Sequence, residues 1–123
     1  MTELEKKAYM LLKSIIFHYH GLDEDEIQNL NETADELGAH NELKWASDFI
    51  SEDHMTSFDR ARKYLNGIIG DMTKEKRTKY IHLVWQANLL KGYITEMEAT
   101  AMMQLALDWN VHQELLELVK GKE

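Results

Sequence analysis

The residue types best suited to hold a metal ion gather in one short segment. His18 and His20 are followed at once by four acidic residues, Asp23 to Glu26. Zinc and nickel accept imidazole nitrogens together with carboxylate oxygens. Residues two apart on a helix point about 200° away from each other, so both histidines can reach one ion only if the helix breaks between them. The alternative is that Asp23 to Glu26 only cap and charge the start of a helix.

Two acid–histidine pairs also have a spacing that could serve a site. Glu36 with His40 and Asp108 with His112 are each four residues apart, which places two side chains on one face of a continuous helix. A glycine falls inside the first pair and an asparagine inside the second, at points where the helices are expected to end. We therefore interpret both pairs as by-products of helix ends.

The sequence carries no motif of a familiar catalytic chemistry. It has no glycine-rich phosphate loop, no His-Glu-x-x-His and no Gly-x-Ser-x-Gly. Zero cysteines exclude a disulfide framework, thiol catalysis and a cysteine-based zinc site. We therefore expect a protein that is not an enzyme and has no cofactor, with a divalent metal ion as the alternative.

Composition bounds the fold and the classes of partner. The 123 residues suit one domain, and 44% hydrophobic content without any proline favours an all-α fold. A net charge of −8 opposes binding to nucleic acid. No apolar run approaches the ~20 residues of a membrane span, and the charged N-terminus does not resemble a signal peptide. We expect a cytoplasmic location.

The charge is unevenly distributed along the chain. Residues 14–59 hold twelve acids and a single base, Lys44. The next twenty residues hold seven bases, which are Arg60, Arg62, Lys63, Lys74, Lys76, Arg77 and Lys79. This pattern indicates docking to a charged protein partner, or a homodimer that associates head to tail. Solvated helix faces give the same pattern, and an acidic mimic of nucleic acid is a third hypothesis, which the basic stretch opposes.

Two adjacent methionines, Met102 and Met103, form a second candidate contact surface. Neighbouring residues on a helix cannot both face the core, so one of them is left for a flexible apolar contact.

Apolar residues spaced three and four apart predict a bundle of six to seven helices. The expected segments are 2–21, 23–38, 41–50, 56–70, 73–91, 95–110 and a short final helix from 111. Capping boxes are expected at Thr2, Asp23 and Thr95, and Asn41 is expected to cap the third helix. Ile27 is expected in the core. The helix over 73–91 is apolar nearly all round, which predicts that it is the central one.

The second and sixth segments repeat each other. At an offset of 72 residues, Asp23 pairs with Thr95 and Glu26 with Glu98. The same offset pairs Gly38 with Asn110, the two residue types that best tolerate a left-handed helix end. We expect one domain over 1–123, built from two similar helix–turn–helix units at about 5–45 and 74–116 and related by a pseudo-two-fold axis. Chance similarity between two amphipathic helices is the alternative.

Each unit resembles the TerB-like family, which is named for bacterial tellurite-resistance proteins and is all-helical with two such halves. In that family an Asp-Gly turn is followed by a stretch that ends in Glu, and the Asp and Glu are associated with metal binding. The segment from Gly92 to Glu98 has the family spacing, and the segment from Gly21 to Glu26 is one residue shorter. The resemblance implies an interaction or stress-response accessory role.

The family's Asp position is occupied here by His20 in one unit and Lys91 in the other. A protonated lysine cannot ligate a cation, so a family-type metal site is lost in the second unit, where only Glu98 matches. In the first unit it survives only in altered form, with His20, Asp23 and Glu26 as the candidate ligands. Tellurite resistance itself is not carried over.

Overall fold

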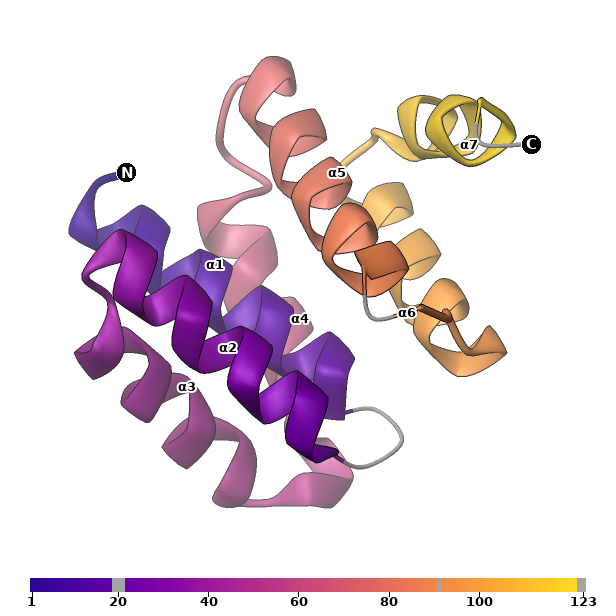
Figure 1. The fold of residues 1–123 in the computed structure, drawn as a ribbon. Coiled ribbons are helices and arrows are strands. Elements are labelled where there is room, and N and C mark those ends of the chain that lie inside the picture. The colour runs from indigo at the N-terminus through magenta and orange to yellow at the C-terminus, as the bar shows by residue number, and fades with distance from the viewer. Residues whose placement is uncertain (19–21, 91, 122–123) are drawn as a thin grey trace.

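Seven α-helices and one 3-10 turn make up the fold, in a computed structural model that describes residues 1–18, 22–90 and 92–121 (Figure 1). No strand occurs in those ranges, so the predicted all-α class is confirmed. The helices are α1 Glu3–Phe17, α2 Glu24–Leu37, α3 His40–Ser51, α4 Ser57–Ile68, α5 Lys74–Leu90, α6 Glu96–Asp108 and α7 His112–Lys120, with the 3-10 turn η2 His54–Thr56 before α4. Buried side chains from all seven helices join one hydrophobic cluster.

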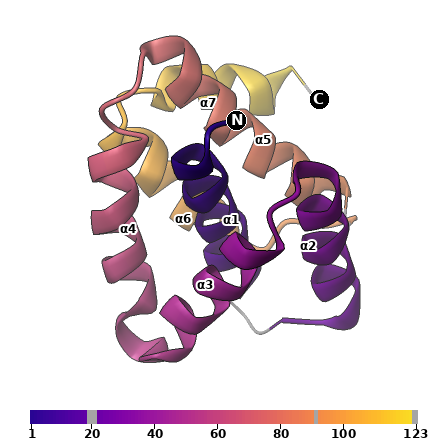
Figure 2. The same ribbon diagram turned by 90° about the vertical axis from the view of Figure 1, so that its left-hand side faces the viewer.

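The central helix is α1. Every residue from Ala8 to Phe17 is buried. α1 contacts α2, α3, α4, α5 and α6, and Figure 2 shows it inside the ring of the other helices. The prediction that the helix over 73–91 is central is wrong, because α5 lies at one side of the bundle and leaves Leu89 and Leu90 exposed.

The three predicted capping boxes all form. The side chains of Thr2, Asp23 and Thr95 each accept a hydrogen bond from the backbone N–H three residues later. The glutamate at that later position accepts from the backbone N–H of the cap in return. Helices α1, α2 and α6 therefore begin where the sequence predicts.

The ends of α2 and α6 also share one geometry. Gly38 and Asn110 both adopt the left-handed conformation, with φ of 62° and 57°. In each case the next backbone N–H donates to the carbonyl five residues earlier, at 2.8 Å. This is the closure of a Schellman motif. The repeat at an offset of 72 residues is thus a repeat of local backbone structure, and the pseudo-two-fold axis remains a prediction.

Two local predictions are wrong. α3 begins at His40, one residue before Asn41, and its start has no side-chain cap. The Schellman turn leaves only Gly38 and Ala39 between α2 and α3, so no loop remains for Asn41 to cap. Ile27 is 43% exposed, because α2 reaches the core through Leu30 and Ala34 instead.

The two units differ in how they pack on each other. α6 packs against α1. The equivalent pair of helices by the repeat, α2 and α5, makes no comparable contact within the described residues. The space between α2 and α5 therefore stays open above α1.

Replacing Gly38 by alanine is expected to destabilise the protein by about 1 kcal/mol, because an L residue is strained at positive φ. An added Cβ meets nothing within 4 Å, so the cost is conformational and not steric. Gly67, inside α4 with equally open surroundings, is the control. Gly67→Ala should instead raise the free energy of unfolding in urea by up to about 1 kcal/mol. Equal stability of Gly38→Ala and wild type contradicts the left-handed cap.

Candidate functional site

The candidate metal ligands either form helix caps or lie outside the described ranges. His20 falls in the segment that the structure does not describe. Glu26 and Glu98 are 1% and 0% exposed and close the capping boxes of α2 and α6. Asp23 accepts from the backbone of Glu26 at 2.8 Å. Among the described residues, no three His, Asp or Glu side chains come together as a metal site.

Neither acid–histidine pair is formed. His40 contacts Asp35 in place of Glu36. Asp108 is bound by a residue of α4 in place of His112. The contact of Asp108, with a residue 46 positions earlier, is one that a spacing of four residues does not reveal.

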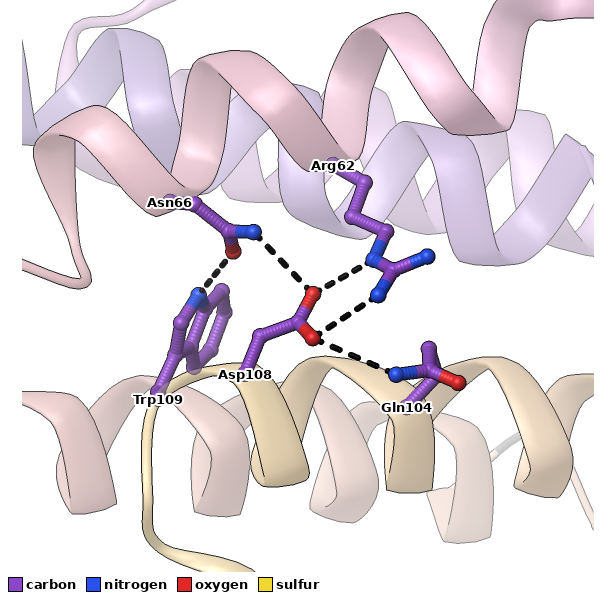
Figure 3. Close-up of polar contacts among 5 residues, drawn as sticks. All are labelled: Arg62, Asn66, Gln104, Asp108 and Trp109. Atoms are coloured by element: carbon purple, nitrogen blue, oxygen red, sulfur yellow. Dashed lines mark hydrogen bonds and ion pairs between the residues drawn. The ribbon is translucent and has the colours of Figure 1, made fainter.

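Asp108 is the centre of a polar cluster between α4 and α6 (Figure 3). The Arg62 guanidinium donates to both carboxylate oxygens, at 2.5 and 2.9 Å. Asn66 and Gln104 donate to the same carboxylate at 3.0 and 3.2 Å, and Trp109 donates its indole N–H to Asn66 at 2.8 Å. The hydrogen bond from Arg62 lowers the pKa of Asp108. Arg62, predicted as a partner-binding residue, is therefore bound by side chains of its own chain.

A second cluster joins α5 to the start of α1. Tyr80 donates to the Glu5 carboxylate at 2.8 Å, and the Lys76 ammonium lies 3.3 Å from the same oxygen. Glu5 is 9% exposed. The bond from Tyr80, followed by backbone and lysine bonds, lowers the pKa of Glu5 to about 2. Lys76 is therefore also engaged within the protein.

The remaining predicted basic residues do not form one surface. Arg60 donates to carbonyls at the end of α3 and in the loop after it, at 2.9 and 2.8 Å. Lys74 pairs with a glutamate of α7 at 3.4 Å, and Arg77 donates to the carbonyl that follows α6 at 2.6 Å. Lys63 forms no hydrogen bond or ion pair with a described residue, and Lys79 lies near the ring of its neighbour Tyr80. Five of the seven bases thus brace one helix against another.

Met102 and Met103 differ in burial, as expected for neighbouring residues of a helix. Met102 is fully buried, with its sulfur 3.8 Å from the amide nitrogen of Asn88. Met103 is partly buried and packs at the edge of the core. Neither offers a wide exposed apolar surface.

An open groove lies between α2 and α5, with α1 as its floor. We call it the α2–α5 groove. Its volume is about 410 Å³. The floor is Tyr9 and Lys13, and Met1 lies at the rim. The walls are Asn29, Glu32, Thr33, Glu36 and Leu37 of α2, and Leu83, Gln86, Ala87 and Leu90 of α5.

The groove combines charges and apolar side chains on opposite walls. Glu32 and Glu36 make no ion pair with any described residue. On the α5 wall, Leu90 is 81% exposed. The α2 wall is thus acidic and the α5 wall apolar.

Lys13 is a buried cation at the floor of the groove. Its side chain donates to the Thr33 hydroxyl at 2.6 Å, and the residue is 4% exposed. Burial lowers the pKa of Lys13 to about 8, while Glu36 and Glu32 act in the opposite direction. Burial and then Glu36 raise the pKa of Tyr9 to about 12. A buried ammonium with one hydrogen bond costs stability.

Sequence reasoning missed this groove. Asp23 to Glu26 are interpreted as a helix start and Glu36 as half of an acid–histidine pair, while the sequence predicts no role for Lys13. The acidic segment 23–36 is predicted as a docking face, but not as one wall of a groove. The available signal was spacing. Residues 29, 32, 33 and 36 form one stripe along α2, and 83, 86, 87 and 90 form the equivalent stripe along α5.

No known protein family, curated protein or solved structure matches this chain. The resemblance to the TerB-like family therefore stays a prediction. None of the described helices has both the length and the apolar character needed to cross a bilayer.

Replacing Lys13 by methionine should raise the free energy of unfolding at pH 7 by about 1–3 kcal/mol, since a buried charge is exchanged for an apolar chain of similar length. Thr33 keeps its own hydrogen bond to the Asn29 carbonyl, so no donor is orphaned.

The pH dependence has a definite sign. The lysine pKa is 10.5 in the unfolded chain and about 8 in the folded one. The advantage of methionine is therefore full below pH 8 and shrinks as pH rises from 8 towards 10.5. Lys63→Met is the exposed control and should stay within about ±0.5 kcal/mol of wild type. A loss of stability in Lys13→Met would show that Lys13 is a structural support.

Proposed function

We propose that this chain is a non-enzymatic, cytoplasmic helical module that binds another protein through the α2–α5 groove. The observation that carries the proposal is the presence, in one groove, of two carboxylates that make no ion pair with a described residue and of an exposed leucine on the other wall. Apolar surface rimmed by polar groups is typical of protein interaction sites. The resemblance to the TerB-like family agrees with a role as an accessory protein.

The arrangement of charge favours the α2 side, and not the basic stretch, as the binding face. Most residues of the basic stretch are held by internal partners, as Arg62 is by Asp108 and Lys76 is by Glu5. Glu32 and Glu36 of α2 make no ion pair with a described residue. The surface field around α2 is therefore negative and attracts a basic partner.

The apolar side of the groove supports a specific contact in addition to attraction at a distance. Leu90 and Met1 are 81% and 45% exposed, and both line the groove. Burying such side chains supplies affinity, at about 25 cal/mol for each Å² of apolar surface removed from water. Charge then sets which partner approaches and apolar contact holds it.

Capture from a lysate of the source cells, with the whole chain as bait, tests this role. Proteins retained by wild type should be lost from the double variant Glu36→Gln/Leu90→Ser. The matched control Glu24→Gln/Leu107→Ser removes one exposed acid of α2 and one exposed leucine of α6 outside the groove. The control should retain the same proteins, and capture should weaken as salt rises from 50 to about 500 mM because exposed charges are screened. Identical capture by wild type and the groove variant rules the proposal out.

A further inference from the structure

We infer that the α2–α5 groove receives a basic amphipathic α-helix of the partner protein, seated along the α5 wall with its cations towards α2. This inference rests on the proposed function and names the partner's chemistry.

Backbone hydrogen bonding selects a helix over an extended peptide. Both walls are helices whose N–H and C=O groups are bonded within the helix, and no strand edge exists in the described ranges. An extended segment would find no backbone partners on the apolar wall, and unpaired buried peptide groups are costly. A helix satisfies its own backbone and presents side chains only.

The shape of the walls fits a helix of limited length. The wall residues of α5 run from Leu83 to Leu90 and recur at i, i+3, i+4 and i+7. At 1.5 Å per residue this stripe is about 10 Å long, or two helical turns. Ala87, in the middle of the stripe, is 6% exposed and lies between the two leucines. The partner helix therefore contributes apolar residues with the same i, i+3, i+4, i+7 spacing.

The charges of the groove select the sign of the partner. Glu32 and Glu36 lie on the α2 wall, one helical turn apart. The ammonium of Lys13 is 4% exposed at the floor and offsets one of these charges from below, leaving the rim acidic. A partner helix with Lys or Arg on the side facing α2 forms charge-assisted contacts there, whereas an acidic helix is repelled.

A second copy of this chain does not supply that helix. Its basic helices are α4 and α5, and five of the seven bases on them, Arg60, Arg62, Lys74, Lys76 and Arg77, are bound to their own chain. The other two, Lys63 and Lys79, lie on different helices, so neither helix keeps a row of unpaired cations. α5 is also a wall of the groove itself. The occupant is therefore a different protein.

The experiment is a selection of random 16-residue peptides displayed on phage against the whole chain. Display suits this contact because a groove two turns long is below the ~1,200 Å² of standard interfaces, so binding by a free peptide is weak. Enriched peptides should carry net positive charge and apolar residues at i, i+3 or i+4, and i+7. A proline at the centre of an enriched peptide should abolish binding, since it breaks a helix.

Two variants of the chain locate the binding. Glu32→Gln/Glu36→Gln/Leu90→Ser should weaken the enriched peptides by about tenfold or more, and the control Glu24→Gln/Asp25→Asn/Leu107→Ser should not. Thermal unfolding of both variants before the assay confirms that each is folded.

Several results overturn the inference. These are enrichment of acidic or neutral peptides, binding that survives the central proline, equal binding to the groove variant, and the absence of any enriched peptide. If lysate capture depends on the groove while the selected peptides are not basic helices, the inference fails and the proposed function stands. If capture does not depend on the groove, both fail.

Discussion

The burial of α1 from Ala8 to Phe17 is the constraint on which the rest of the structure depends. A helix enclosed by five others must bring its polar side chains inside, and each then needs a partner from a neighbouring helix. Glu5 obtains Tyr80 and Lys76 from α5, while Lys13 obtains Thr33 from α2. These contacts join α1 to α5 near its start and to α2 further along, and the groove lies between α2 and α5.

The same principle explains why an acidic protein keeps one free acidic surface. Bases of α4 and α5 are consumed in holding helices together, most clearly where Arg62 of α4 binds Asp108 of α6. The excess acids, which give the net charge of −8, remain on helices such as α2 that have few bases beside them. The uneven charge that is visible in the sequence is thus largely structural on its basic side, whereas on the acidic side Glu32 and Glu36 make no ion pair with a described residue. The proposed binding to a basic partner is consistent with both the engaged bases and the unpaired acids.

Local features of the fold were predictable, and contacts between distant segments were not. The caps at Thr95 and Gly38 follow from side chains within four residues, so sequence alone identifies them. Hydrophobic spacing shows which face of a helix is apolar but not which helices cover that face. For this reason the prediction that α5 is the central helix is wrong. The Arg62–Asp108 pair joins residues 46 apart, and the groove needs three helices at once. Neither can be read from spacing along one segment.

The central claim is that the floor of the groove holds a desolvated ammonium ion below an acidic wall. NMR titration of the lysine side chains, with Lys13 assigned by comparison with Lys13→Met, measures this directly. The account predicts a pKa of about 8 for Lys13, well below the ordinary 10.5. Neutralising the nearby acid in Glu36→Gln should lower it further, since that carboxylate favours the charged form. A Lys13 pKa at 10.5 or above would mean that the amine is solvated or fully paired, which contradicts the account.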